Sequence, residues 1–134
     1  MEKQLVVSGK RKTAIARATI VNGNGKVIIN KKPYQLLPLI KRFRIEEPLR
    51  ITTEKLGKLN FDINVNVVGG GQAGQIEAAR LAIAKAIVEF TKNAELKKTY
   101  HSYDRHLLVA DTRRKESYKP GDSKARSKRQ KSYR

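Results

Sequence analysis

The chain has 134 residues, of which 30 are lysine or arginine and only 12 are aspartate or glutamate, so its formal net charge is +18. This length suits one domain with a modest core and an appendage. The absence of cysteine excludes disulfides and thiolate metal sites. No apolar run approaches membrane-spanning length, and the first residues are too polar for a signal peptide. We therefore expect an intracellular, cytoplasmic protein with an acidic partner.

The first thirty residues predict strands separated by tight turns. Residues 4–8 read as a short strand, followed by a basic turn over residues 9–12. Residues 13–21 alternate, with a row of alanines on one side, which is strand periodicity. Glycine and asparagine at residues 22–25 favour a tight hairpin, with residues 26–29 returning as the partner strand.

The middle of the chain predicts a basic connector, a strand and a long helix. In residues 33–50, Pro38 and Pro48 are expected to separate two short helical stretches. Residues 61–68 alternate between apolar and polar side chains, so one face of this strand should be buried and the other wet. From about residue 73 to residue 91, apolar side chains recur at helical spacing and charged ones lie opposite.

After that helix, Asn93 is predicted as a cap, and residues 94–108 are expected to hold one or two short helices. Residues 107–110 read as a short edge strand or a helix end. Four strands followed by helices indicate an α+β fold, with a small, mainly antiparallel four-stranded sheet and helices packed on one face. We expect a globular body over residues 1–112 and an extended basic tail over residues 113–134.

The tail is the most strongly charged part of the chain. It contains ten basic side chains, two acidic ones and very few apolar ones. Such a segment buries too little apolar surface to offset the entropy of ordering it, so we expect it to become ordered only against a dense anionic surface. A polyphosphate backbone is the main candidate, and a tail that only aids solubility is the alternative.

A second cluster of basic residues lies in the body, so the positive charge of the chain is not confined to the tail. It comprises residues 8–13, together with Arg17 and the connector residues Lys41, Arg42 and Arg44. Several tyrosines are interleaved with basic residues, and such rings can stack on unpaired bases or pack against the body. The tyrosines concerned are Tyr100, Tyr103, Tyr118 and Tyr133, and we favour packing for the first two.

Residues 69–75, Gly-Gly-Gly-Gln-Ala-Gly-Gln, allow two interpretations. They form a sharp strand-to-helix turn with close backbone packing, or they offer backbone N–H groups at a helix start to a nucleic-acid phosphate. The pattern is not a P-loop, because no Gly-Lys-Ser/Thr is present, and it lacks the acidic residue of a dinucleotide site. Nucleotide hydrolysis is therefore disfavoured.

No catalytic or metal constellation emerges. His101 and His106 do not share a helical face, and no carboxylate or thiol completes a metal set around them. The acidic residues are sparse and sit among lysines and arginines, where salt bridges are their ordinary role. We expect neither an enzyme nor a cofactor nor a metal.

Several motifs together resemble one family. They are residues 69–75 with the alanines that follow, residues 111–116 (Asp-Thr-Arg-Arg-Lys-Glu), residues 119–121 (Lys-Pro-Gly) and the basic ending of residues 124–134. Residues 7–17 resemble the start of the same family. This is the universal small-subunit ribosomal protein family S nine, in its archaeal or eukaryotic-like form, and the resemblance covers nearly the whole chain.

The resemblance implies more than the residues alone predict. It implies a body with an unusual left-handed βαβ crossover, bound to 16S-type ribosomal RNA in the head of the small subunit beside neighbouring head proteins. It also implies that the end of the tail approaches the anticodon stem-loop of the peptidyl-site transfer RNA. The transfer-RNA-binding residues carried over are Lys128, Arg129, Lys131 and Arg134.

The predicted ribosomal-RNA-binding residues combine the basic clusters with the glycine loop. They are Lys10, Arg11, Lys12, Arg17, Lys41, Arg42, Arg44, Gly69, Gly70, Gly71, Arg113, Arg114, Lys115, Lys119, Lys124 and Arg126. Two alternatives remain open on the sequence alone. Basic composition alone permits a DNA-compacting protein, and the glycine loop permits a phosphotransfer enzyme, which would need a nucleotide pocket and acidic magnesium ligands.

Overall fold

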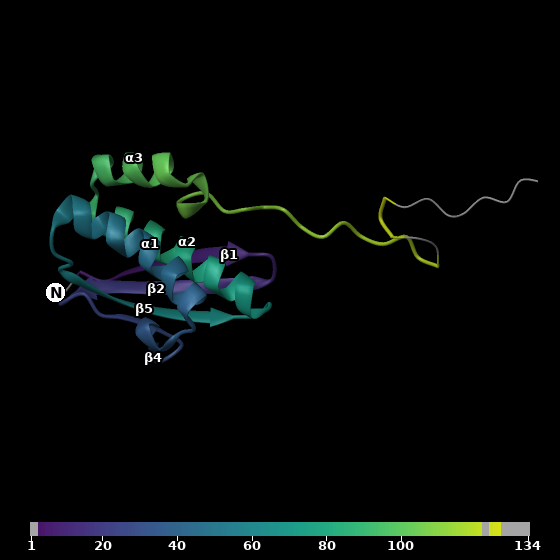
Figure 1. The fold of residues 1–134 in the computed structure, drawn as a ribbon, viewed down its shortest axis with the longest axis horizontal. Helices are drawn as coiled ribbons and strands as arrows, with labels where there is room; N and C mark the ends of the chain where they lie inside the picture. The colour runs from purple at the N-terminus through teal and green to yellow at the C-terminus, as the bar shows by residue number, and fades with distance from the viewer. Residues whose placement is uncertain (1–2, 122–123, 127–134) are drawn as a thin grey trace, which may run out of the picture.

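The computed structural model describes residues 3–121 and 124–126 and consists of one sheet covered by helices (Figure 1). In chain order the elements are β1 (Leu5–Arg11), β2 (Ala14–Asn22), β3 (Val27–Ile29), β4 (Lys32–Pro33), the 3₁₀ turn η1 (Tyr34–Leu36), α1 (Leu39–Leu56), β5 (Phe61–Val68), α2 (Gln72–Thr91), α3 (Ala94–Tyr103) and the 3₁₀ turn η2 (Arg105–Leu107). The described part of the tail contains no helix or strand, and Figure 1 shows it leading away from the body.

The strand order of the sheet is β1-β2-β5-β3-β4. Neighbouring strands are antiparallel except β3 and β5, which are parallel and are connected through α1. The α+β class with a mainly antiparallel sheet is confirmed, and it contains a βαβ unit. The sheet has one strand more than the four predicted, because the two residues of β4 pair with β3. The hand of the crossover stays a prediction.

The predicted hairpin between residues 13–21 and 26–29 is wrong. β2 pairs with β5, and β3 lies on the far side of β5. The chain does reverse at residues 22–25, but the loop passes around the start of β5. There the Asp62 carboxylate accepts hydrogen bonds from the backbone N–H groups of residues 24–26, at 2.9 to 3.1 Å. A strand that arrives forty residues later is invisible to a local turn pattern.

The first hairpin of the sheet is formed by β1 and β2. Residues 9–11, predicted as part of a turn, belong to β1, and Lys10 and Arg11 pair with Ile15 and Ala14. The reversal is confined to Lys12 and its neighbour, and Lys12 has a positive φ of 54°. Because successive strand residues point to opposite faces, Lys10 lies on the open face of the sheet and Arg11 on the helix-covered face.

The connector forms one continuous helix, α1, rather than the two short stretches predicted. Pro48 lies inside this helix, although it cannot donate a backbone hydrogen bond. Its side chain is buried, and its carbonyl oxygen accepts hydrogen bonds from the Tyr100 hydroxyl at 3.0 Å and the Thr52 hydroxyl at 2.7 Å. Tertiary packing against α3 therefore outweighs the local proline signal.

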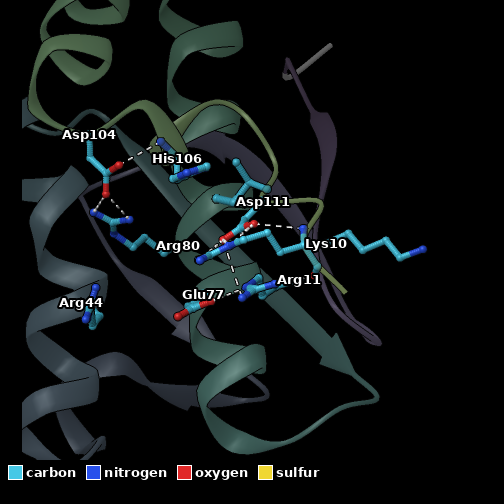
Figure 2. A pocket seen from close by; sticks show the side chains of 10 residues that line it. Lys10, Arg11, Arg44, Glu77, Arg80, Asp104, His106 and Asp111 are labelled. Carbon is cyan, nitrogen blue, oxygen red and sulfur yellow. Dashed lines mark hydrogen bonds and ion pairs between the residues drawn. The ribbon is translucent and has the colours of Figure 1, made fainter. Parts of the chain in front are cut away.

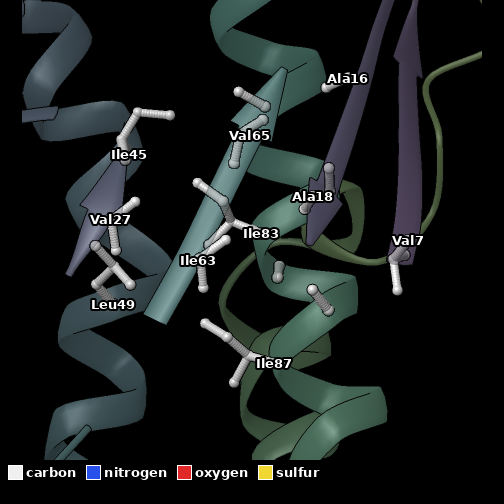
Figure 3. Packing of buried hydrophobic residues seen from close by; sticks show 14 of the residues in the cluster. Val7, Ala16, Ala18, Val27, Ile45, Leu49, Ile63, Val65, Ile83 and Ile87 are labelled. Carbon is white, nitrogen blue, oxygen red and sulfur yellow. The ribbon is translucent and has the colours of Figure 1, made fainter. Parts of the chain in front are cut away.

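The core lies between the sheet and the helices (Figure 3). Ile83 and Ile87 of α2 face Ile63 of β5, and the alternating residues of β2 and β5 point toward them, as the sequence predicted. Gly9 of β1 allows the close approach of α2, because a Cβ at that position would lie 2.5 Å from the Ala78 carbonyl oxygen. The alanine row thus allows the helix to lie directly on the strands.

The end of the body follows the predicted pattern with one difference. Asn93 caps α3, and its side-chain oxygen accepts hydrogen bonds from the backbone N–H groups of Glu95 and Leu96. Residues 94–108 hold one α-helix and one 3₁₀ turn, and residues 108–110 form no strand. Tyr100 is fully buried, as favoured above, whereas Tyr103 is exposed.

Candidate nucleic-acid interface

Two basic clusters that are a hundred residues apart in sequence meet at one end of the body. Lys10 and Lys12, from β1 and its turn, line a shallow hollow together with Arg114 and residues 110–112 at the start of the tail. The exit of the tail therefore lies beside the first hairpin. The sequence predicted both clusters as phosphate-binding, and the structure brings them together.

A neighbouring hollow, which shares Lys10, is lined by Arg44 of α1 and by side chains of β1, α2 and the tail (Figure 2). Lys10, Lys12, Arg44 and Arg114 are all exposed, and their side chains make no hydrogen bond or ion pair with any other described residue. We call these four residues the basic rim. Because no carboxylate neutralises them within the described part, they present four positive charges to solvent.

Arg11 lies beneath the basic rim and connects three parts of the molecule. Its Nε donates to Glu77 of α2 at 2.7 Å, and its Nη1 donates to the Arg113 backbone carbonyl oxygen at 3.1 Å. Its Nη2 lies 3.6 Å from Asp111, and the side chains of Arg11 and Asp111 are each only 13% exposed. Arg11 was predicted to bind RNA, but in the structure it joins β1, α2 and the tail root.

Asp111 completes this junction from the tail side. It accepts hydrogen bonds from the backbone N–H and the guanidinium of Arg113, the shortest at 2.7 Å. The Arg113 guanidinium holds the pKa of the Asp111 carboxyl well below its usual range, helped by the backbone N–H and by the charge of Arg11. The carboxylate is thus ionised at any physiological pH, and it fixes the first turn of the tail.

Arg80 is a structural cation that the sequence reading did not identify. Its side chain is 8% exposed, and its guanidinium contacts Glu47 of α1 and Asp104, the latter at 3.1 Å. Burial alone would raise the pKa of Asp104, but hydrogen bonds from the His106 backbone N–H and from Arg80 lower it overall. The only signal in the sequence is an arginine on the otherwise apolar side of a helix, between Ala79 and Leu81.

The remaining predicted residues of the body are dispersed. Arg17 lies exposed on the open face of the sheet, diagonally across from Lys10 in the β1–β2 register. Lys41 donates to the Gln72 side chain at the start of α2. Arg42 donates to Glu46 at 2.8 Å and is therefore partly neutralised within α1. Only Arg44 of this connector belongs to the basic rim.

The glycine loop forms the sharp strand-to-helix turn that was one of its two interpretations. Gly69 and Gly70 have positive φ values of 78° and 65°, and a Cβ on Gly69 would lie 2.6 Å from the Thr13 carbonyl oxygen. Gly71, by contrast, has φ −91°, and a Cβ there would meet no atom within 4 Å. The backbone geometry explains the first two glycines but not the third.

The tail residues are described as far as residue 126, with a gap at residues 122–123. Lys115 lies over the Tyr118 ring at 4.4 Å from its centroid, and Arg126 donates to Glu116 at 2.8 Å. Lys119 and Lys124 are exposed. The transfer-RNA residues implied by the resemblance, together with Tyr133, lie outside the described residues; those transfer-RNA residues are Lys128, Arg129, Lys131 and Arg134.

Within the described ranges, no group of histidine, aspartate and glutamate side chains is arranged to hold a metal ion. Nor is any helix in those ranges both long and apolar enough to cross a membrane. His101 and His106 are both exposed.

A basic body with a cationic tail rooted at its basic end is a fold and surface typical of proteins that work within folded RNA. Comparison with known families specifies this class: the family described as Ribosomal protein S9/S16 matches residues 9–134. The chain belongs to this ribosomal protein family.

Individual relatives match along almost the whole length. A protein from Methanococcus vannielii, named Small ribosomal subunit protein uS9, is 51% identical over 129 residues, which cover 94% of this chain and 95% of the relative. The protein of the same name from Picrophilus torridus is 49% identical over 135 aligned positions that cover both chains fully. The family resemblance found in the sequence motifs is confirmed.

Proposed function

We propose that this chain is a structural component of the small ribosomal subunit, where its body binds ribosomal RNA through the basic rim. The observation that supports this proposal is that Lys10, Lys12 and Arg114 lie together at the exit of the tail, with Arg44 lining the neighbouring hollow, and that none of the four has a partner among the described residues. The names of its relatives place them in that subunit. Archaeal ribosomes work in the cytoplasm, and this is the expected location.

The basic rim would act by charge rather than by reading sequence. Lysine and arginine side chains at an RNA backbone displace condensed counterions, and the contacts fix orientation. Arg44 and Arg114 can each hold one phosphate by two hydrogen bonds, whereas the lysines act as point charges. No bond-making step, cofactor or metal enters this role.

The rim is tested by neutralising three of its residues together, with Lys10→Gln, Lys12→Gln and Arg114→Gln in one chain. The matched control replaces three cations remote from the rim, with Lys55→Gln, Lys97→Gln and Lys98→Gln. We measure binding to a fragment of small-subunit ribosomal RNA against salt concentration. The slope of the log–log plot should flatten by roughly 0.7–0.9 per lost contact in the rim variant, and by less in the control.

Equal slopes for the two triple variants would contradict the rim as the interface. A competition with duplex DNA at matched salt tests the alternative of a DNA-compacting protein. We expect the chain to bind the folded ribosomal RNA more tightly than the duplex DNA. Equal affinity for both nucleic acids would favour the alternative.

For the tail, we propose that its last residues contact the peptidyl-site transfer RNA. This part of the proposal rests on the family resemblance, because residues 127–134 lie outside the described part. Deleting residues 128–134 should leave subunit assembly intact and weaken binding of transfer RNA in the peptidyl site. The matched control keeps the length and removes the charge by serine substitution of the four basic residues. Both variants should be impaired alike, and normal transfer RNA binding by either one would contradict the proposal.

A further inference from the structure

A groove of about 630 Å³ runs between the first turns of α1 and α2, next to the basic rim but different from it in character. Its walls are mainly apolar. The residues that line it are Pro38, Leu39, Ile40, Lys41, Arg44, Ala73, Ile76 and Glu77. The proposed RNA contacts leave this groove unexplained.

Large aliphatic side chains beside this groove lie in water. The exposed fractions are 72% for Leu36, 62% for Leu39 and 77% for Ile40, and Phe43 one turn later is 46% exposed. Single exposed apolar residues are ordinary, but Leu39, Ile40 and Phe43 lie three to four residues apart on one side of α1, and such a group of exposed apolar side chains is of the kind that marks an interaction site. Among the described residues, the Arg50 guanidinium lies over the Phe43 ring at 5.9 Å from its centroid, and the three aliphatic side chains stay at least 62% exposed.

An RNA backbone is a poor cover for such a patch, because phosphate and ribose offer little apolar surface. Removing branched aliphatic side chains from water requires another apolar surface. A segment of another protein can supply that surface.

The charges around the groove specify the partner further. Glu77 is the one acidic residue in the lining, and its carboxylate is already paired with Arg11 at 2.7 Å. Arg44, by contrast, has no partner among the described side chains, and Lys41 contacts only the neutral amide of Gln72. The first turn of α2 contains no acidic residue, and its N-cap residue, Gly71, makes no side-chain capping bond. The net field at the groove is therefore positive.

We propose that this groove binds a segment of a neighbouring small-subunit protein that alternates apolar side chains with carboxylates. A leucine-like or aromatic side chain would lie against Leu39 and Ile40. An adjacent carboxylate would pair with Lys41, which leaves Arg44 to the RNA contacts of the basic rim. The class of partner rests on the proposed function, because a ribosomal subunit supplies other proteins at close range. The groove's chemistry is independent of that function and can be tested alone.

The first test uses the free, full-length chain and two fluorescent peptides of equal negative charge. One peptide alternates aspartate with leucine and phenylalanine, and the other alternates aspartate with serine. We expect the apolar peptide to bind about tenfold or more tightly, since burying one large aliphatic side chain accounts for that ratio. Ile40→Ser should remove the difference, and the matched control Val68→Ser, at a similarly exposed position on the open sheet face (67% against 77%), should keep it. Equal binding of the two peptides to the unmodified chain would overturn the proposal.

The second test places a photoreactive phenylalanine derivative at position 40 of the full chain in purified small subunits, with position 68 as control. A cross-link from position 40 to a protein peptide that contains apolar and acidic residues supports the proposal. Cross-links to RNA, to a second copy of this chain, to a peptide without carboxylates, or to nothing would overturn it. Absence of the unmodified chain from the small subunit would instead contradict the proposed function. The peptide test would still show whether the groove binds an apolar and acidic segment.

Discussion

The guanidinium of Arg11 donates a hydrogen bond to the backbone carbonyl oxygen of Arg113 at 3.1 Å, so a residue of the first strand holds the first residue of the tail. The same side chain bonds Glu77 of α2. The body therefore sets the direction in which the tail begins, whatever surface the tail later meets. A cationic tail that starts from a fixed point has fewer orientations to lose on binding, which lowers the entropic cost of ordering it.

Replacing Arg11 with Gln should release the tail root without unfolding the body. The substitution removes two ion pairs, with Glu77 and with Asp111, and leaves Asp111 held only by Arg113. Hydrogen exchange of residues 109–114 should become faster, while exchange in β2 and α2 stays unchanged. Arg17→Gln is the matched control, because Arg17 is an exposed arginine in the same hairpin that makes no hydrogen bond or ion pair with the described part of the tail. Unchanged exchange at the tail root in the Arg11 variant would show that the junction does not restrain it.

Because the Tyr100 hydroxyl is buried, the free energy of unfolding should fall at high pH. Burial raises the pKa of Tyr100 to about 12, above the ordinary value near 10, although its hydrogen bond with Thr52 opposes the rise. Between these two values the unfolded chain loses the proton and the folded chain keeps it. The stabilisation is complete below pH 10 and is lost as the pH rises to 12, by up to about 3 kcal/mol.

The measurement for Tyr100 compares the free energies of unfolding of the unmodified chain and Tyr100→Phe across this pH range. Lysines titrate in the same window in both proteins, so the difference between the two curves isolates the tyrosine. At neutral pH the variant should be less stable by about 0.5–1.5 kcal/mol, because the Pro48 carbonyl loses a buried donor. The two curves should cross between pH 10 and pH 12, because the loss from ionisation exceeds the advantage at neutral pH, and the unmodified chain becomes the less stable protein. Parallel curves would contradict the raised pKa.

Asp62 should contribute to stability as the acceptor that holds the loop of residues 24–26 around the start of β5. Asp62→Ala removes the acceptor for three backbone N–H groups and should lower the free energy of unfolding by about 1–3 kcal/mol. The hydrogen bond from the Lys26 N–H is the largest of several causes that lower the pKa of Asp62. Its stabilisation is therefore full above pH 4 and fades as the pH falls through the lowered pKa.

Urea unfolding at pH 7 and at pH 3 measures this effect. The stability difference between the unmodified chain and the Asp62→Ala variant should shrink at the lower pH. Asp62→Asn retains one oxygen acceptor and should lie between the two proteins at pH 7. A difference that grows on acidification would contradict the role of the carboxylate.

The strands and the long helix were predictable because their signals are local. Alternation in residues 13–21 and 61–68 reflects one buried face of each strand, and the structure buries those faces. The helical spacing of residues 73–91 predicted the helix, although residues 78–84 are buried on all sides and not on one face alone. The pairing of strands in the sheet could not be predicted in this way, because it depends on residues that are distant in sequence. Nothing near residues 22–25 shows that β5 will lie between β2 and β3.

The candidate interface shows the same contrast between signals that are local in sequence and contacts that depend on the fold. The basic clusters were visible as charge runs, but their meeting at the tail exit depends on the fold. Arg11 and Arg44 look alike in sequence, yet one is bound to Glu77 and the other has no partner in the described structure. Pro48 likewise signalled a helix end, but α1 continues through it, with the proline buried and its carbonyl oxygen bonded to the Tyr100 hydroxyl.

The glycine loop offers a substitution in which stability and RNA binding should change in opposite directions. Gly69 and Gly70 are needed by the turn, so alanine at either should cost about 1–3 kcal/mol. Gly71 occupies the N-cap of α2 with open space around it. Gly71→Asp places a carboxylate where N2 and N3 backbone N–H groups lack a capping side chain, and it should raise the free energy of unfolding by about 0.5–1 kcal/mol.

The same carboxylate would repel an RNA phosphate bound at that helix start. If the loop contacts RNA, as the sequence predicted, Gly71→Asp should bind the ribosomal RNA fragment more weakly although it is the more stable protein. Gly71→Asn is the matched control, because asparagine caps a helix equally well and carries no charge. It should bind RNA like the unmodified chain. Equal RNA affinity of the Asp and Asn variants would show that the loop serves the fold alone, and that all RNA contacts of the body lie elsewhere.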